Sequence, residues 1–327
     1  AAELLGAEQP LEIVFTGGGT ESDNLAVKGA ALTGGRRGGV VTTAVEHEAV
    51  LESARFCSRM GCPVTIVGVD ETGRVDPTEV AAAVDPHTSV VSVMTANNET
   101  GARQPVLKVA EAVRAVRPDV VIHTDAVQAF VSEDVTVAAL GADLITLASH
   151  KFGGPKGVGL LYVHRGIDLE PVVHGGGQEL NRRSGTHNVA GIVGMVTAME
   201  AAVADRDRFQ ARVGEARRRF EDLLLQATPD LVVNGPLDDR LVQHSHVRIP
   251  GIKSETLLIR LDRAGVAAAA GSACQSGAVE LSHVLEAMGM SHQAASECLR
   301  FTFGWTTTPK EGDEAARRVI AAVEGLR

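Results

Sequence analysis

The stretch LITLASHKFGGPKGVGLLYV (residues 144–163) has an apolar run at each end and a polar turn rich in glycine and lysine between them. Short, nearly all-apolar runs are typical of β-strands that are buried on both faces of a sheet. Similar runs occur earlier, at residues 13–15, 40–43, 64–69, 90–94 and 120–123. Helical patterns lie between these runs, at residues 23–32, 47–60, 77–84 and 106–116. This alternation predicts an α/β fold with a parallel or mostly parallel sheet that helices cover on both faces.

The pattern changes after Asn188. A long helical stretch rich in alanine, arginine and glutamate runs to about Leu225, and a second unit follows with strands of its own at residues 231–233 and 246–249. A chain of 327 residues has room for two domains of roughly 150 residues each. We therefore expect a larger domain over residues 1–205 and a smaller C-terminal domain over residues 206–327.

The charge balance and the cysteine content exclude several classes of protein. Lysine and arginine total 31 against 41 aspartates and glutamates, a net charge of −10, which disfavours binding to nucleic acid or to an anionic membrane. No apolar run has the length of a membrane span, and the N-terminus has no signal-peptide pattern. The four cysteines have neither zinc-site spacing nor the density of a disulfide framework, so we expect no metal site and a cytoplasmic location.

Polar residues follow three of the expected strands, at the edge where open α/β sheets bind their ligands. A glycine-rich turn, TGGGTESDN (16–24), opens a helix and could hold a phosphate, although a plain strand-to-helix turn has the same pattern. Asp125 could pair with a pyridine nitrogen, or could cap a helix. Lys151 could form a Schiff base beside a phosphate, or could be a surface lysine.

Three further residues are candidates for chemistry. His47 follows the strand at 40–43 and could cap a helix or lie over a cofactor ring and relay protons. Cys274 stands among glycines and serines in GSACQSG (271–277), which suits an exposed, reactive thiol, whereas Cys57, Cys62 and Cys298 are interpreted as packing residues. Arg300, inside the apolar run LRFTFG (299–304), needs an anionic partner such as a substrate carboxylate.

These motifs resemble the cysteine desulfurases, members of class V of the fold-type I enzymes that use pyridoxal 5′-phosphate (PLP). The resemblance extends through the whole chain, and the lysine motif together with the GSAC loop is its most specific part. The matching stretches are FTGGGTESDNLAVKG (15–29), VEHEAVLES (45–53), TANNETG (95–101), HTDAVQA (123–129), SHKFGGPKGVG (149–159), HGGGQELNRRSGTHN (174–188), GSACQSG (271–277), SHVLEAMG (282–289) and LRFTFG (299–304).

The resemblance implies a fold-type I PLP-transferase fold and a reaction that converts L-cysteine to L-alanine. Lys151 would carry the cofactor and move protons, Asp125 would pair with the pyridinium nitrogen, and His47 would stack on the ring. Cys274 would take the sulfur as a persulfide for a sulfur-acceptor protein in iron–sulfur cluster assembly or in thio-cofactor or tRNA biosynthesis. Asn98 and Arg300 would hold the substrate carboxylate.

The other cofactor contacts that the resemblance implies come from both subunits of a homodimer. Those of the same subunit would be Gly19, Thr20, Asn98, Gln128 and His150, and Thr186 of the partner subunit would join them at the phosphate.

The chain departs from the family pattern at several points. Residues 17–19 are all glycine where Ser-Gly-Ala is more usual, Ala148 stands where many members carry a phosphate-binding serine, and Gln275 is larger than the usual serine or threonine. The chain also begins inside what resembles a helix, so that about 50 family residues, which include a stretch that lines the site, would precede it.

Two alternatives stay open at this point. A selenocysteine lyase or a cysteine sulfinate desulfinase belongs to the same class but depends less on a cysteine nucleophile. A non-catalytic scaffold that binds sulfur acceptors is the alternative from a different class. The scaffold would be colourless, whereas an enzyme that carries PLP is yellow.

Overall fold

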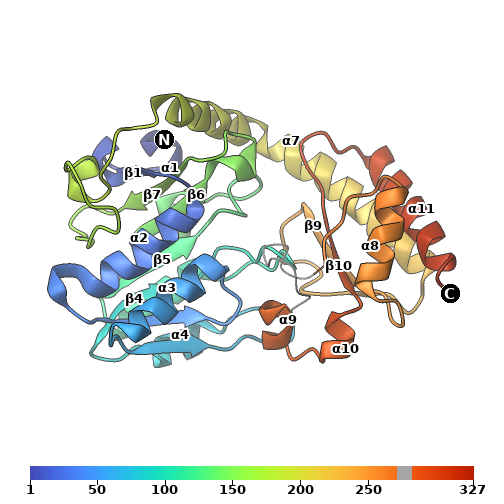
Figure 1. Ribbon diagram of the computed structural model, residues 1–327, viewed down its shortest axis with the longest axis horizontal. Helices are drawn as coiled ribbons and strands as arrows, with labels where there is room; N and C mark the ends of the chain where they lie inside the picture. The colour runs from blue at the N-terminus through green and yellow to red at the C-terminus, as the bar shows by residue number, and fades with distance from the viewer. Residues whose placement is uncertain (271–281) are drawn as a thin grey trace. The chain divides into compact units, whose positions relative to one another are not determined.

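The apolar runs of the first part of the chain form a seven-stranded sheet with the order β1-β7-β6-β5-β4-β2-β3 (Figure 1). Strands β2 to β6 pair in parallel, while β7 runs antiparallel to both of its neighbours, β6 and β1. The expected mostly parallel sheet is thus confirmed. The strands are β1 (Ile13–Thr16), β2 (Gly39–Thr43), β3 (Val64–Val67), β4 (Thr88–Ser92), β5 (Val121–Asp125), β6 (Leu144–Ala148) and β7 (Gly159–Val163).

The computed structural model describes residues 1–270 and 282–327, which divide into two units. The first unit comprises residues 1–69, 74–96 and 104–205, and the second comprises 70–73, 97–103 and 206–327. Within the described residues, no helix combines the length and the apolar character that crossing a membrane requires.

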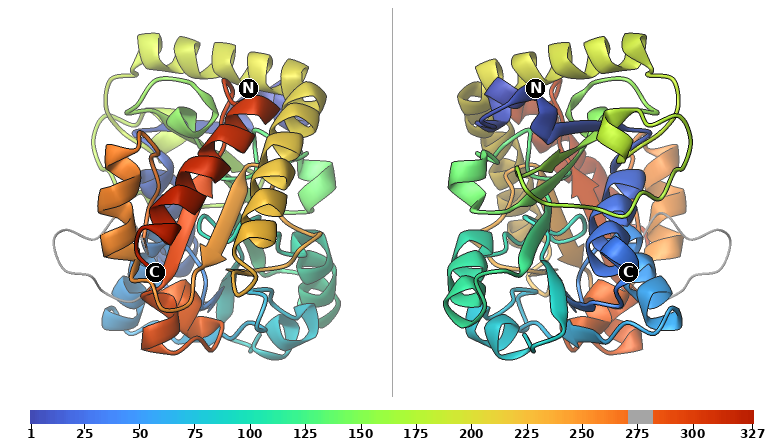
Figure 2. Two further views of the ribbon diagram at one scale, coloured as in Figure 1. Left: turned by 90° about the vertical axis from the view of Figure 1, so that its right-hand side faces the viewer. Right: turned by 90° about the vertical axis from the view of Figure 1, so that its left-hand side faces the viewer.

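Helices cover both faces of the sheet in the first unit. Helices α2 (Gly19–Leu32) and α3 (Glu48–Arg59) pack against each other on one face, and α4 (Pro77–Ala82) and α5 (Val106–Val116) pack together. Figure 2 shows the blue α2 and α3 and the teal α5 on opposite sides of the strands. The shorter elements are α1 (Ala2–Leu5), α6 (Val137–Leu140), and the 3₁₀ turns η1 (Pro10–Glu12), η2 (Thr33–Gly35), η3 (Ser149–Phe152) and η4 (Glu179–Asn181).

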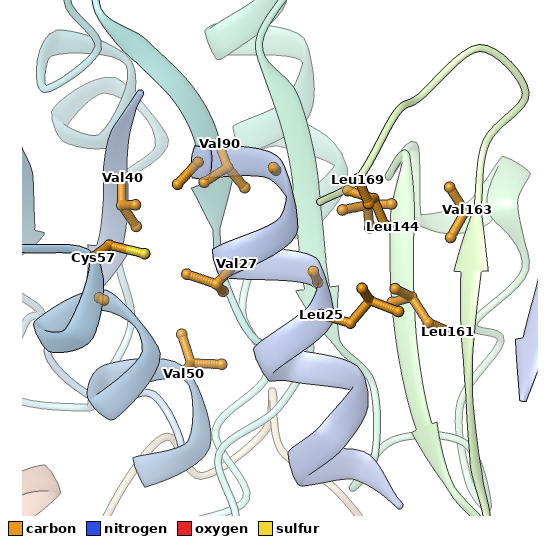
Figure 3. Close-up of a cluster of buried hydrophobic side chains, with 14 of the residues drawn as sticks. Leu25, Val27, Val40, Val50, Cys57, Val90, Leu144, Leu161, Val163 and Leu169 are labelled. Carbon is orange, nitrogen blue, oxygen red and sulfur yellow. The ribbon is translucent and has the colours of Figure 1, made fainter. Parts of the chain in front are cut away.

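The core of the first unit lies between α2, α3 and the sheet (Figure 3). Leu25 of α2 lies beside Leu161 of β7, and Val27 faces Val50 of α3; all four side chains are buried. Burial of each such side chain stabilises the fold by about 1.5–3 kcal/mol. The core therefore fixes α2 on the sheet, and with it the glycine-rich turn at the start of α2.

The second unit is built on the antiparallel sheet β10-β9-β8. The rings of Phe301 and Phe303 pack on Phe220, which belongs to the long helix α7 (Val189–Ala227). The other elements are β8 (Val232–Val233), β9 (His244–Arg248), β10 (Cys298–Thr302), α8 (Ser254–Arg263), α9 (His283–Ala287), α10 (His292–Ala295) and α11 (Pro309–Glu324).

Strand β9 begins two residues earlier than the apolar run had predicted. Its first residues, His244, Ser245 and His246, are polar and yet buried, because β9 lies between β10 and β8 in the sheet. The ring of His246 hydrogen-bonds through Nδ1 to Asn234 Nδ2 at 2.9 Å. An apolar pattern could not reveal a strand that begins with buried polar residues.

We predict that Gly159→Ala destabilises the protein by about 3 kcal/mol, because the added Cβ atom clashes with backbone atoms, which cannot move as a side chain can. This atom would lie 2.7 Å from the carbonyl carbon of Gly18 and 2.8 Å from the carbonyl oxygen of Leu147. Gly68→Ala is the matched control, since its Cβ would meet no atom within 4 Å. Denaturant unfolding of both variants checks the prediction, and equal stabilities would contradict it.

Candidate active site

The first turn of α2 leaves its backbone N–H groups open. Gly18 is the N-cap residue and supplies no side-chain cap, so the N–H groups of Gly19 and Thr20 have no acceptor within the helix. The glycine-rich loop before the helix is fixed by a hydrogen bond that does not involve these N–H groups, since Glu21 Oε2 accepts the N–H of Gly17 at 2.9 Å. A helix start of this kind binds anions through its N–H groups and its dipole.

A cavity of about 810 Å³ opens in front of this turn. Gly19 and Thr20 form part of its wall, together with His150 and Lys156 from the turn after β6. Burial lowers the pKa of His150, and the charges of Lys151 and Lys156 lower it further. The donor set (helix N–H groups, a hydroxyl, an imidazole and an ammonium) fits a phosphate group.

Asp125 ends β5, and its carboxyl group is buried. Its Oδ1 accepts the N–H of Val127 at 2.9 Å in a turn, and no helix starts at these described residues, so the helix cap considered as an alternative was wrong. Burial raises the pKa of Asp125, while His47, that hydrogen bond and Lys151 act in the opposite direction. A cation placed against this carboxyl group would therefore be strongly favoured, as a protonated pyridine nitrogen is.

His47 is the N-cap residue of α3, and its Nδ1 accepts the N–H of Ala49 at 3.1 Å. The cap also fixes the orientation of the imidazole, which lowers the pKa of Asp125. Capping and a cofactor contact, which the sequence offered as alternatives, are compatible at this residue.

Lys151 lies in η3, directly after β6, and is exposed. Its charge acts on the buried carboxyl group of Asp125, which belongs to the neighbouring strand β5. Gln128 follows Asp125 by three residues and is half-buried. Thr186 lies in the exposed segment that leads into α7.

The remaining site candidates belong to the second unit. Arg300 of β10 donates from Nη1 to the carbonyl oxygen of Asn98 at 2.9 Å, so these two residues meet. Within the described residues Arg300 forms no ion pair, which leaves its guanidinium group available for an external carboxylate. Cys274 and Gln275 lie outside the described residues.

Two buried carboxyl groups of the first unit were not among the sequence candidates. Asp23 lies on α2 and Glu46 directly before His47, and neither exposes more than 1% of its surface. Burial, the neighbouring Asp125 and Glu46 all raise the pKa of Asp23 well above the usual range. Burial raises the pKa of Glu46 to about 8. The sequence carries no clear signal of their burial, since Asp23 is the first residue of the predicted helix 23–32 and Glu46 precedes the predicted helix 47–60.

Comparison with known proteins supports one family. The family description for class-V aminotransferases matches residues 1–314. The cysteine desulfurase IscS of Dictyoglomus turgidum is 40% identical over 327 residues, which is 100% of this chain and 82% of the relative. A solved NifS-like protein superposes with a TM-score of 0.91 at 35% identity, covering 99% of this chain and 86% of the other. SspA, solved in complex with cysteine, superposes with a TM-score of 0.78 at 32% identity, covering 92% of this chain and 84% of the other.

The chain therefore belongs to the class-V aminotransferases and, within them, to the cysteine desulfurase family. The family resemblance of the sequence motifs and the expected fold are both confirmed.

We predict that Glu46→Gln removes part of the pH dependence of stability. A carboxyl group with a pKa of about 8 in the folded protein and 4.5 in the reference state binds a proton that the unfolded chain releases. The stability contributed by that proton is complete below pH 4.5, and it is lost as the pH rises from 4.5 to 8. At pH 7 this loss is about 3 kcal/mol. A glutamine side chain still offers an oxygen that accepts the hydrogen bonds of Thr43 Oγ1 and the N–H of Met94. It does not titrate, so the stability of the variant does not fall with this proton.

The check is the free energy of unfolding of wild type and Glu46→Gln at pH 5 and at pH 8. The variant should lose less stability than wild type between these two values. Equal losses in the two proteins would contradict the prediction.

Proposed function

We propose that the protein is a PLP-dependent cysteine desulfurase that converts L-cysteine to L-alanine and holds the sulfur as a persulfide on Cys274. The observation that carries this proposal is the position of Lys151 and Asp125. Asp125 ends β5, and Lys151 follows the end of the neighbouring strand β6. The open first turn of α2 stands at the edge of the same sheet. A lysine, a buried carboxyl group and an anion site together match the chemistry that PLP requires.

The residues of the first unit would share the work of holding the cofactor. Gly19, Thr20 and His150 bind the phosphate, Asp125 keeps the pyridine nitrogen protonated, and His47 covers the ring. Gln128 hydrogen-bonds near the phenolic oxygen, as does Asn98 of the second unit. When bound, PLP supplies an electron sink that weakens bonds at the substrate's α and β carbons. Domain 1–205 thus binds the cofactor, and domain 206–327 carries the cysteine loop.

The substrate would be held and attacked by residues of the second unit. Arg300 and Asn98 bind the carboxylate of L-cysteine. The thiolate of Cys274 attacks the substrate sulfur, so that an S–S bond forms and the C–S bond breaks. The substrate carbon keeps the electron pair of that bond and takes up a proton, for which Lys151 and His47 are the carriers. The products are L-alanine and a persulfide, which passes to an acceptor protein.

A homodimer is part of the proposal, with Thr186 of the partner subunit reaching the phosphate. Three consecutive residues before it, Glu179, Leu180 and Asn181, have positive φ angles, which cost about 1 kcal/mol or more each. The turn exposes 56% of Leu180, and Val189 and Val193 of α7 are 67% and 60% exposed. An apolar surface on a strained turn favours burial against a second copy of the chain.

We predict that Lys151→Ala abolishes the visible absorbance band of bound PLP and all production of alanine, because the amine that carries the cofactor is removed. Lys108→Ala, which removes an exposed lysine of α5, is the control and should keep both. Absorbance spectra and an alanine assay of the purified variants provide the measurement. Retention of both signals in Lys151→Ala would exclude this lysine.

We predict that Cys274→Ser keeps the yellow colour but loses persulfide and alanine formation, at least a hundredfold in rate. A serine hydroxyl is far less acidic than a thiol and is a weak nucleophile toward sulfur. Cys62→Ala and Cys298→Ala remove buried free thiols and serve as matched controls. Mass spectrometry after one turnover locates the persulfide. A persulfide on another cysteine, or full activity of Cys274→Ser, would favour a selenocysteine lyase or a sulfinate desulfinase.

A further inference from the structure

A buried chain of hydrogen bonds crosses three neighbouring strands beneath the proposed cofactor site. Ser92 Oγ of β4 lies 2.8 Å from His123 Nδ1 of β5, and His123 Nε2 lies 3.1 Å from Thr146 Oγ1 of β6. All three side chains are completely buried. His123 stands two residues before Asp125, whose backbone partner in the sheet is Thr146. The chain of hydrogen bonds therefore lies next to Asp125, the residue proposed to pair with the pyridinium nitrogen.

Asp23 joins this chain to the helix that binds the phosphate. It lies on α2, three residues after Thr20, and its Oδ1 is 3.7 Å from His123 Nε2. The hydroxyl group of Thr146 interacts with the same carboxyl group. The Oδ1 atom is buried and accepts no hydrogen bond from any described residue. Asp23 thus contacts both the helix start and the strands β5 and β6.

The charge state of this carboxyl group follows from its neighbours. The charged groups that act on Asp23 are Asp125 and Glu46, both acidic, and its one basic neighbour in the described residues, His123, is itself buried. Burial lowers the pKa of His123 to about 3, so the imidazole is neutral and offers no positive charge. An ionised Asp23 would be a buried charge without a counter-ion, which costs several kcal/mol.

Asp125 is in the opposite situation, although it also interacts electrostatically with Asp23 and Glu46. His47 and Lys151 both favour its ionised form. A negative charge on Asp23 would compete with the charge on Asp125 and would also repel the phosphate at the start of α2. A single negative charge among these three carboxyl groups avoids the repulsion, and Asp125 is the one on which His47 and Lys151 act.

We propose that Asp23 is a positioning residue that acts as a neutral acid. Its carboxyl group holds the phosphate-binding start of α2 against His123 and Thr146, and so sets the spacing between the two ends of the cofactor site. This inference rests on the proposed function for the identity of the cofactor. The protonation of Asp23 does not depend on it.

The experiment compares Asp23→Asn, which mimics the neutral acid, with Asp23→Ala, which removes the contact. Asp23→Asn should bind PLP with a dissociation constant within about twofold of wild type, whereas Asp23→Ala should bind about tenfold more weakly. The pH midpoint of the visible band of bound PLP should stay within about 0.3 units in Asp23→Asn, because no charge is lost. A shift of about one unit or more, or weakening in both variants alike, would overturn the proposal.

Infrared difference spectra of the protein without cofactor test the protonation directly. Wild type minus Asp23→Asn at pH 7 should contain the C=O stretching band of a protonated carboxyl group. Asp143→Asn is the matched control, because Asp143 pairs with Arg114 at 2.8 Å and should contribute carboxylate bands instead. Carboxylate bands for Asp23 would overturn the proposal even if PLP binds. If wild type bound no PLP, the proposed function and the positioning role would fail, whereas the infrared result would still decide the charge.

Discussion

Burial of the Asp125 carboxyl group is the constraint on which the rest of the site depends. A carboxylate in a dry environment is unstable unless a cation accompanies it. His47 and Lys151, from two different connections of the chain, both favour its ionised form, and a protonated pyridine ring would complete the balance. The requirement explains why a lysine and a histidine both act on the carboxyl group at the end of β5.

Local pattern was enough to predict the main architecture. Nearly all-apolar runs identified the strands of the large sheet, and the residues that follow those runs identified Asp125, Lys151 and the glycine-rich turn, because a parallel sheet brings its carboxyl ends to one edge. The helix predicted from residue 77 starts there, as α4, and Asp76 caps it by accepting the N–H of Thr78 at 2.7 Å. These predictions depend only on neighbours within a few residues.

Features that depend on distant neighbours were not predictable in the same way. Asp23 and Glu46 have ordinary sequence surroundings, and their perturbed acidity arises from burial by elements far away in the sequence. The early residues of β9 were missed because histidines and a serine fill buried positions there. The local signals for His47 and Asp125 were ambiguous, since both residues accept hydrogen bonds from backbone N–H groups and also act on each other electrostatically.

The reversed direction of β7 has a consequence for how this fold can vary. The segment 149–158, which carries Lys151, connects β6 directly to β7. These two strands are hydrogen-bonded to each other, so both ends of the segment are fixed in the sheet. The other connections of the large sheet pass through helices or longer loops, which tolerate added residues far better. Insertions and deletions should therefore be rare between residues 149 and 158 and common in the segment that leads into α7. The segment that carries the lysine is thus anchored at both ends in the sheet.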